Sequence, residues 1–405
     1  MSRPPVYLDY HATTPVDRRV LERMLPYFCE TFGNPASSTH VWGWKAQEAV
    51  EQSRREVAAL LGASSREVYF TSGATESNNL ALQGAWRAIG AQSSPGSFPA
   101  RGESRADPGM APRRQIVVSA IEHKSVLEGA ERLTQHGAEM TVVPVGRDGV
   151  IDLEALGQVI GAHTALVSVM AANNEIGVVQ PLAAIGAMTR AAGALFHVDA
   201  AQAIGKIPID VGAMQIDLLS LTGHKFYGPK GCGAIFVRKQ TPIDPLIVGG
   251  GQERGMRSGT LNVPGIVGIG AACGICRAEM ADENARVSRL RDRLLAGLTA
   301  GLEGVVVNGS MTTRLPNNLH VSFADVDGES LLIGIGDIAV SSGSACSSAS
   351  GTPSHVLRAI AGGGSVASAS IRFGLGRMTT DEEIDYTVQK FVSVVRHLRA
   401  TAPAH

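Results

Sequence analysis

The chain has 405 residues, 44% hydrophobic and 18% charged, and its 36 basic and 37 acidic side chains give a net charge of -1. A chain of this length and composition is expected to bury a large core and to form more than one domain. The balanced charge excludes the basic surface typical of proteins that bind nucleic acid or anionic membranes, so neither is an expected partner.

The N-terminal sequence MSRPPVYLDY passes directly into a strand-like stretch and lacks the apolar core of a signal peptide. The sequence also offers no evident run of about 18 apolar residues that could cross a bilayer. We therefore expect a water-soluble protein of the cytoplasm.

The cysteines are few and odd in number, which argues against a disulfide scaffold and predicts free thiols at Cys29, Cys232, Cys273, Cys276 and Cys346. Two of them form a CxxC motif, which could be a redox pair or half of a metal site. The motif lies in the helix-like stretch GIVGIGAACGICRAEM, without a second CxxC or paired histidines nearby. This context favours small buried thiols.

Six short apolar runs are typical of buried strands: VYFTS (68–72), QIVVSA (115–120), ALVSVM (165–170), ALFHVDA (194–200), IDLLSLT (216–222) and GAIFVRK (233–239). Helix-length segments separate several of them, so the pattern predicts an α/β domain with a largely parallel sheet. In such a sheet, functional residues gather at the carboxyl ends of the strands. The Ser-, Pro-, Gly- and Arg-rich segment 91–114 is predicted to be a disordered surface insertion.

The pattern changes after residue 265. The charged stretch RAEMADENARVSRLRDRLLAGL predicts a long helix, and NNLHVSFADV, IAVSSGSAC and ASIRFGLG follow it. A closing amphipathic helix places four apolar side chains on one face, at Ile384, Val388, Phe391 and Val395. These elements predict a smaller α+β domain.

Lys225 stands where a Schiff-base lysine is needed. It follows the run IDLLSLT and precedes the turn-rich FYGPKG, so it lies at the mouth of a buried strand. A lysine in this position can form a covalent bond with a carbonyl cofactor. Taken alone, the residue is better explained as an ordinary loop lysine.

Two further segments fit such a cofactor. Asp199 ends the run ALFHVDA, where a carboxylate can keep the ring nitrogen of pyridoxal phosphate protonated, and Gln202 could reach the ring hydroxyl. In TSGATESNN, the residues from Ser72 to Thr75 stand at a predicted helix start, where backbone N–H groups bind phosphate. Plainer alternatives remain, because Asp, Ser and Thr are also common helix caps.

His123 and Asn174 follow two other predicted strands. An imidazole in this position could stack on a cofactor ring or move a proton, although a structural histidine is the alternative. Because Asn174, His123, Asp199 and Lys225 all lie near strand carboxyl ends, together they indicate one site more strongly than any of them alone.

The whole chain resembles the cysteine desulfurases, which are pyridoxal-phosphate enzymes of fold type I in the class V aminotransferase superfamily. The matching stretches cover nearly the whole chain in family order: YLDYHATTP, FGNPASSTH, TSGATESNN, EHKSV, NNEIGVVQ, HVDAAQ, SLTGHKFYGPKG, GGGQERGMRSGTLN, SSGSACSSAS and SIRFGLGR. The resemblance implies a large cofactor-binding domain, residues 16–263, with a mainly parallel seven-stranded sheet. It also implies a smaller α+β domain, residues 1–15 and 264–405, that carries a mobile Cys346 loop.

The resemblance assigns roles to the site residues. Lys225 would hold the cofactor covalently, Asp199 would pair with its ring nitrogen, and His123 would stack on its ring. Gln202 and Asn174 would face the ring hydroxyl, and Arg372, with Asn174, would bind the substrate carboxylate. The phosphate would be held by Ala74, Thr75, Thr222 and His224, and by Thr260 of a neighbouring subunit, which implies a homodimer.

The implied reaction takes sulfur from L-cysteine. The Cys346 thiolate would attack the substrate sulfur, leaving L-alanine and a persulfide on Cys346, while His123 moves protons. Acceptor proteins such as an iron–sulfur scaffold would receive the sulfur, and Cys346 could transiently hold a [2Fe–2S] cluster as a metal ligand. The alternatives are a selenocysteine lyase, another class V aminotransferase-like enzyme, or a non-catalytic sulfur-carrier platform.

Two features depart from the family pattern. The chain ends at LRATAPAH, soon after the last predicted helix, whereas related assembly-type enzymes usually carry a longer tail that contacts the scaffold protein. Scaffold docking through such a tail is therefore in doubt. The insertion at 91–114 is also unusual for the family, and the sequence assigns it no role.

Overall fold

The computed structural model describes residues 5–92, 113–342, 354–362 and 369–401. The predicted insertion at 91–114 falls almost entirely outside these residues, and Cys346 with its predicted loop lies outside them.

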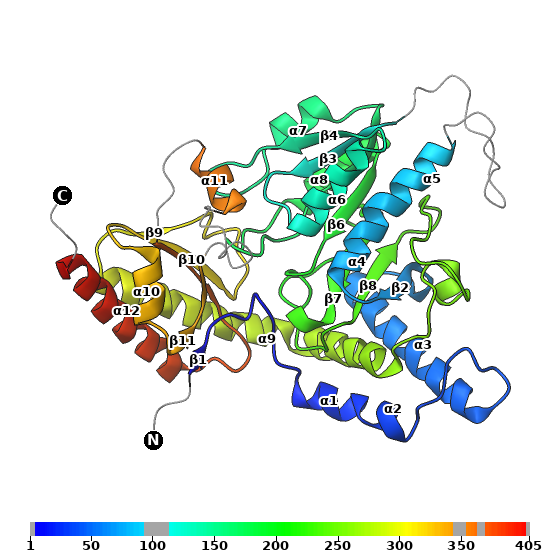
Figure 1. The fold of residues 1–405 in the computed structure, drawn as a ribbon, viewed down its shortest axis with the longest axis horizontal. Helices are drawn as coiled ribbons and strands as arrows, with labels where there is room; N and C mark the ends of the chain where they lie inside the picture. The colour runs from blue at the N-terminus through cyan, green and yellow to red at the C-terminus, as the bar shows by residue number, and fades with distance from the viewer. Residues whose placement is uncertain (1–4, 93–112, 343–353, 363–368, 402–405) are drawn as a thin grey trace.

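A seven-stranded sheet forms the larger part of the molecule (Figure 1). Its strands, in spatial order, are β2 (Val68–Thr71), β8 (Gly233–Val237), β7 (Leu218–Thr222), β6 (Leu195–Asp199), β5 (Thr164–Ser168), β3 (Gln115–Ser119) and β4 (Glu139–Val143). All neighbours from β7 to β4 are parallel, and β8 runs antiparallel to both β2 and β7. The expected mainly parallel sheet is confirmed.

Every strand-like run predicted from residues 68–239 is a strand, but β4 was missed. Its sequence EMTVV lies at the edge of the sheet, and Val142 is 49% exposed. An edge strand lacks the continuous apolar run of a central strand, so its sequence gives a weaker signal.

Helices cover both faces of this sheet. The strand β3 sorts its side chains between them: Val117 packs in the cluster that contains α3 (Val41–Leu61) and α8 (Leu182–Ala191), whereas Ile116 and Val118 pack in the cluster that contains α6 (Lys124–Thr134). This alternation follows from the two-residue period of a strand. The result is a three-layer α/β/α arrangement.

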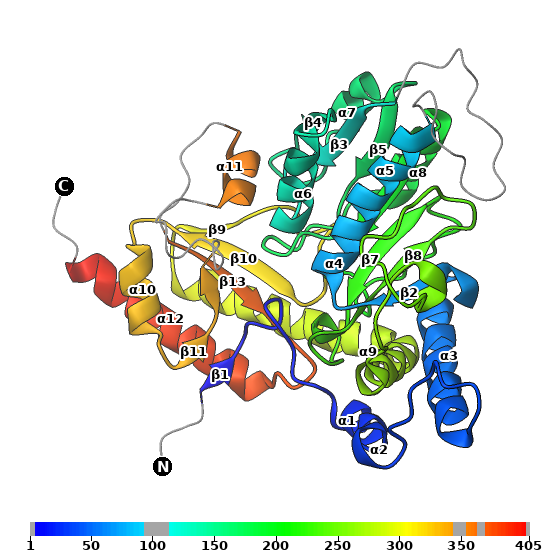
Figure 2. The same ribbon diagram turned by 45° about the vertical axis from the view of Figure 1, so that its right-hand side comes forward.

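One long helical segment crosses a face of the sheet in both views (Figures 1 and 2). It consists of α4 (Ala74–Asn79), a π-helical turn (Leu80–Gly84) and α5 (Ala85–Gln92). The remaining helices of this part are α1 (Arg18–Met24), α2 (Pro26–Cys29) and α7 (Leu153–Val159), with short 3₁₀ turns at Ser65–Glu67, Gly223–Lys225 and Glu253–Gly255.

The smaller part contains a four-stranded sheet in the order β12 (Ser341–Ser342), β13 (Ala369–Gly374), β10 (Asn318–Phe323) and β9 (Val305–Val307). The helices α10 (Gly328–Gly334) and α12 (Asp381–Thr401) accompany it. Three of the four predicted apolar positions of α12 are fully buried, at Ile384, Phe391 and Val395, and Val388 packs at the edge of the same cluster.

The helix α9 (Val263–Gly301) joins the two parts (Figure 1). Its side chains up to Cys276 pack in the core of the larger part, and those from Val287 onward pack in the core of the smaller part. The change from one core to the other therefore falls inside α9, whereas the predicted boundary at 263/264 coincides with its first turn.

The first half of α9 is also long and apolar enough to match a membrane span by length and composition, a match that the sequence analysis did not recognise. Just over half of the matching window is buried in the protein. Helices in the core of a protein pass the same test, so the match is weak evidence of a span.

The N-terminal segment runs from the smaller part to the larger one. The strand β1 (Val6–Tyr7) pairs in parallel with β11 (Ile338–Ala339), and further on the Thr14 amide donates to the His224 carbonyl at 2.9 Å. This segment therefore passes the carboxyl end of β7. Further along the sheet, α11 (His355–Ala361) packs on residues that follow the carboxyl ends of β3 and β5: Ile121, Met170, Ile176 and Val178.

Candidate active site

Lys225 lies at the carboxyl end of β7, as its sequence context predicted. The five residues of β7 are buried, and a 3₁₀ turn follows them directly and carries Lys225. The lysine Nζ donates to the carbonyl oxygens of His11 at 2.5 Å and Ala12 at 2.7 Å. The N-terminal segment thus meets the reactive lysine of the predicted site.

His11 is the residue that the sequence analysis missed at this point. It is 1% exposed, its Nδ1 lies 2.9 Å from Oε1 of Gln202, and its Nε2 lies 3.1 Å from Nδ2 of Asn318. Burial is the main reason that the pKa of His11 falls to about 3, with the charge of Arg372 second. A neutral His11 therefore joins the N-terminal segment to β10 and to the segment that follows β6.

Gln202 is engaged at both ends of its amide by His11, because its Nε2 also donates to the His11 carbonyl at 3.0 Å. The predicted role of Gln202 was to face the cofactor hydroxyl. Its contacts connect it to Lys225 through the shared His11 carbonyl.

The predicted phosphate-binding residues come together where two glycines allow a close approach. A Cβ on Gly233 of β8 would lie 2.6 Å from the Cα of Gly73, so only glycine lets β8 pack against the turn before α4. A Cβ on Gly73 would lie 3.5 Å from the Thr222 hydroxyl oxygen. Ala74 and Thr75 open α4 at this place, and Thr75 is exposed.

His224, next to Lys225, has its Nδ1 3.1 Å from the Thr13 hydroxyl. Burial, helped by the charges of Lys225 and Lys230, lowers the pKa of His224 to about 4. The imidazole is neutral near pH 7 and keeps one N–H, which is what a neutral donor to a phosphate oxygen requires.

Asp199 ends β6 and is 4% exposed. Its Oδ1 accepts from the Ala201 amide at 2.9 Å, and its Oδ2 accepts from Nδ2 of Asn78 at 2.8 Å. Asn78 lies on α4 inside the stretch TSGATESNN, but no role had been assigned to it. The carboxylate keeps further lone pairs, so it can accept from a protonated ring nitrogen.

His123 caps the N-terminus of α6, and its Nδ1 lies 2.8 Å from the Ser125 hydroxyl. The same hydroxyl accepts from Nδ2 of Asn78 at 2.9 Å. Two side chains, Asn78 of α4 and Ser125 of α6, therefore connect His123 to Asp199 at the end of β6.

Arg372 lies on β13 and is 6% exposed. It donates to Oδ1 of Asp9 at 2.7 Å, to the Ser341 hydroxyl at 3.0 Å and to the Asn174 carbonyl at 2.9 Å. Its Nε is buried and has no hydrogen-bond partner among the residues that the structure describes. The predicted substrate residues Arg372 and Asn174 are thus in contact.

Two acids near the site, one buried and one half-buried, were not predicted. Glu122 is fully buried, its Oε1 accepts from the Met170 amide at 2.7 Å, and its Oε2 has no partner in the described ranges. Burial holds the pKa of Glu122 well above its usual range. Burial also raises the pKa of Glu175 to about 7, and this carboxylate accepts from the Ser354 hydroxyl at 2.5 Å.

The remaining predicted residues are only partly described. Thr260 is exposed in the segment before α9. Cys346 lies outside the described residues, so its predicted catalytic and metal-binding roles have no structural account here. Within the described ranges, no group of three or more His, Cys, Asp or Glu residues could hold a metal ion.

The CxxC cysteines lie on the buried face of α9, as their sequence context favoured. Cys273 is 0% exposed and Cys276 is 3% exposed. Burial raises the pKa of the Cys276 thiol to about 11 and that of Cys273 well above its usual range. Both are packing residues in this structure.

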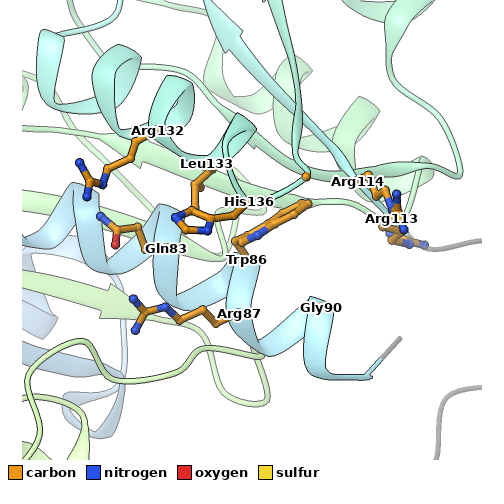
Figure 3. Close-up of a pocket in the computed structure, with 10 residues that line it drawn as sticks. Gln83, Trp86, Arg87, Gly90, Arg113, Arg114, Arg132, Leu133 and His136 are labelled. Carbon is orange, nitrogen blue, oxygen red and sulfur yellow. The ribbon is translucent and has the colours of Figure 1, made fainter. Parts of the chain in front are cut away.

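A cavity of about 500 Å³ lies apart from these residues, between α5 and the end of α6 (Figure 3). Its lining includes Trp86, Arg87, Arg132 and His136. Arg113 and Arg114 also line it and lie to the right of Trp86 in this view. None of the predicted site residues lines it, so the candidate site is the edge formed by the carboxyl ends of β3, β5, β6 and β7.

Comparison with known proteins agrees with this assignment. The sequence model of the family described as aminotransferase class-V matches residues 6–94 and 102–387. The protein named cysteine desulfurase IscS of Anaeromyxobacter sp. (strain Fw109-5) is 52% identical over 403 residues, which cover 99% of this chain and 95% of that protein. The human protein named cysteine desulfurase is 48% identical over 401 residues, covering 98% of this chain and 83% of that protein.

A solved structure described as a NifS-like protein has 39% sequence identity and a TM-score of 0.85, and the match covers 97% of this chain and 100% of that one. The chain therefore belongs to the aminotransferase class-V family. The relatives with which it shares about half of its residues are cysteine desulfurases, so the resemblance and the fold type I architecture predicted from the sequence are confirmed.

Proposed function

We propose that this chain is a pyridoxal-phosphate-dependent cysteine desulfurase, which converts L-cysteine to L-alanine and leaves the sulfur as a persulfide on Cys346. The observation that carries the proposal is the convergence of Lys225, Asp199, His123 and Arg372 on one edge of the sheet. When bound, the cofactor supplies an electron sink that makes the substrate α-proton acidic.

The residues at this edge fit that cofactor. Asp199 is a buried carboxylate with unused lone pairs, and Lys225 stands beside it at the end of the neighbouring strand. The Gly73 turn lies close to the Thr222 hydroxyl, and Ala74 and Thr75, with their free first-turn N–H groups, follow it at the start of α4. In this proposal these groups, with His224, hold the phosphate, while Asp199 keeps the ring nitrogen protonated.

Arg372 is the proposed binding residue for the substrate carboxylate. Its Nη groups are fixed by Asp9, Ser341 and the Asn174 carbonyl, whereas its buried Nε has no partner within the described part of the chain. A planar guanidinium held in this way suits a carboxylate better than a flexible ammonium does. Asn174, whose carbonyl it contacts, would share the substrate site.

The proposed chemistry balances without an external oxidant. The Cys346 thiolate attacks the sulfur of the bound cysteine, the carbon–sulfur bond breaks, and the sulfur leaves as part of the new S–S bond. Lys225 takes the α-proton and later returns one to the α-carbon, and a second proton delivered to the former β-carbon completes L-alanine. His123 is the proposed carrier for protons of the thiol and of that carbon.

The direct test is to incubate the protein with L-cysteine, quantify L-alanine, and locate the persulfide by mass spectrometry of alkylated peptides. We expect the persulfide on the Cys346 peptide, none in C346A, and neither alanine nor the visible absorbance of the lysine-bound cofactor in K225A. A modification on another cysteine, or sulfide release by C346A at the wild-type rate, would show the mechanism to be wrong.

The protein is further proposed to act as a homodimer, with Thr260 reaching the phosphate bound by the second copy. In its support, large apolar side chains are exposed from α1 to the start of α3, on these helices and on the residues that connect them, at Leu21, Leu25, Phe28, Phe32, Val41, Trp42 and Trp44. The Phe32 and Trp42 rings stack at 5.2 Å, so α3 and the segment after α2 share one apolar surface. Exposed apolar surfaces of this kind mark interaction sites.

Light scattering tests this assembly. We expect the wild type to have the mass of a dimer and W42E to dissociate. V306E, which changes an exposed side chain on β9, is the matched control and should remain a dimer. A monomeric wild type with full activity would contradict the shared phosphate site.

The persulfide is proposed to pass to acceptor proteins in the cytoplasm, such as an iron–sulfur scaffold, with Cys346 as a transient ligand of the nascent [2Fe–2S] cluster. The support is the family resemblance and the cysteine thiolate chemistry of such clusters. Adding a scaffold protein to the persulfidated enzyme should move the labelled sulfur from the Cys346 peptide to the scaffold, and no transfer would contradict this step.

A further inference from the structure

A continuous series of hydrogen bonds runs from Asp199 to His123 through two side chains to which the proposed reaction gives no role. Nδ2 of Asn78 donates both to Oδ2 of Asp199 at 2.8 Å and to Oγ of Ser125 at 2.9 Å. The Ser125 hydroxyl in turn lies 2.8 Å from Nδ1 of His123. Asn78 is 0% exposed, so water does not compete for its amide.

The direction of each hydrogen bond follows from the one before it. An ionised carboxylate can only accept, so Asn78 must present its NH₂ group to Asp199. The second hydrogen of that NH₂ group goes to the Ser125 oxygen, and the Ser125 hydrogen is then left for Nδ1 of His123. The Ser125 backbone amide also donates to Nδ1, at 3.2 Å.

Both groups that contact Nδ1 of His123 are therefore donors, which requires an unprotonated Nδ1. A neutral imidazole then carries its proton on Nε2. The position of His123 at the N-terminus of α6 also favours an unprotonated Nδ1, because the free amides of the first helical turn need a hydrogen-bond acceptor.

We infer that Asn78 and Ser125 are positioning residues that transmit the ionised state of Asp199 to His123 and hold its imidazole in the Nε2–H form. The inference rests on the proposed function, in which His123 moves protons. It specifies the geometry of that role: the neutral imidazole presents a hydrogen-bond donor at Nε2, while Nδ1 accepts from the Ser125 hydroxyl and amide.

The test is the nitrogen chemical shifts of His123 in cofactor-loaded protein labelled with ¹⁵N-histidine, with H123Q used to assign the signals. The two tautomers of imidazole are distinguished by these shifts. We expect the wild type to be in the Nε2–H form, and N78A and S125A to shift toward a mixture with the Nδ1–H form. S125T retains a hydroxyl and should restore the wild-type pattern.

The matched control is N79A, because Asn79 is the neighbouring asparagine on α4 and bonds instead to the Thr75 carbonyl and to Gln83. It should leave both the His123 shifts and the turnover unchanged. In N78A we expect kcat to fall about tenfold with a smaller change in KM, since proton transfer by a positioned group is worth about 10²–10⁴-fold and is only partly lost.

An unchanged His123 tautomer in S125A and N78A, or an Nδ1–H form in the wild type, would overturn the inference. S125A decides alone if N78A does not fold, because Ser125 is only partly buried and alanine is tolerated in a helix. A wild type that makes no alanine from L-cysteine would instead contradict the proposed function, since the tautomer is measured without turnover.

Discussion

Arg372 and Asp9 form an ion pair in which Nη2 lies 2.7 Å from Oδ1, and the two side chains are 7% and 18% exposed. The pair joins β13 to the N-terminal segment that also carries His11. A charged hydrogen bond of this kind is worth about 1.5–3 kcal/mol. It fixes the guanidinium in one orientation at the predicted substrate site.

The conservative variant R372K is expected to raise KM for L-cysteine by about 10- to 100-fold, with a smaller effect on kcat. Lysine keeps the charge but cannot contact Asp9, Asn174 and a substrate carboxylate at the same time. The measurement is alanine formation as a function of L-cysteine concentration. R289K, at an exposed ion pair with Asp381, is the control, and a KM for R372K within twofold of wild type would contradict the substrate role.

Gly233 is predicted to tolerate no side chain. In G233A the new Cβ would lie 2.6 Å from both the Gly73 Cα and the Leu221 carbonyl oxygen, so β8 and the turn before α4 must separate. Overpacking of this kind costs about 1–3 kcal/mol, and it displaces the proposed phosphate-binding amides. We expect a lower unfolding temperature and at least tenfold weaker cofactor binding, measured by thermal unfolding and cofactor titration.

The control for that variant is G90A, since a Cβ on Gly90 of α5 would meet no atom of the described residues within 4 Å. Alanine there should be neutral or should stabilise the helix by up to about 1 kcal/mol. Equal cofactor affinity in G233A and G90A would mean that the Gly73 turn does not bind the phosphate.

The strands that carry the site could be predicted because each central strand is buried on both faces and reads as an apolar run. Lys225 and Asp199 follow such runs directly, so their common edge followed from the parallel topology. The edge strand β4 and the continuity of α9 through both cores left no comparable signal in the sequence.

The partners of the site residues could not be predicted. His11 and Asn318 are 307 positions apart, and His11 and Lys225 are 214 apart, so only the folded chain brings them together. Asn78 is one of two adjacent asparagines, and the helical turn alone decides which of them faces Asp199. Local sequence patterns carry no information about contacts of this range.

Glu175 is predicted to make stability depend on pH. Burial raises its pKa to about 7, whereas the pKa of a glutamate in the unfolded chain is about 4.3. Between these values the folded chain holds a proton that the unfolded chain has lost, so the free energy of unfolding falls as pH rises through this window. At a pH above this window the folded chain must hold Glu175 ionised in a half-buried place, which lowers the free energy of unfolding by on the order of 2 kcal/mol for a partly exposed group. Glutamine carries no charge, so E175Q removes this destabilisation.

The measurement compares unfolding temperatures of the wild type and E175Q at pH 5 and pH 8. We expect E175Q to gain stability relative to the wild type at pH 8 and to gain much less at pH 5. E128Q changes an exposed glutamate on α6 and should show the same difference from wild type at both pH values. A constant difference for E175Q as well would place its titration outside this window.

The buried cysteines are predicted to be unreactive in the native protein. Cys29 is exposed, whereas Cys232, Cys273 and Cys276 are buried, and burial raises the pKa of Cys232 and Cys276 to about 11. Only the thiolate reacts with alkylating reagents, so native protein treated with iodoacetamide should be modified at Cys29 and spared at the other three. Peptide mass spectrometry before and after unfolding in urea measures this, with C29S as the control. Native labelling of Cys273 or Cys276 would instead show that α9 opens enough to expose the CxxC pair, and a redox or metal role for it would then have to be reconsidered.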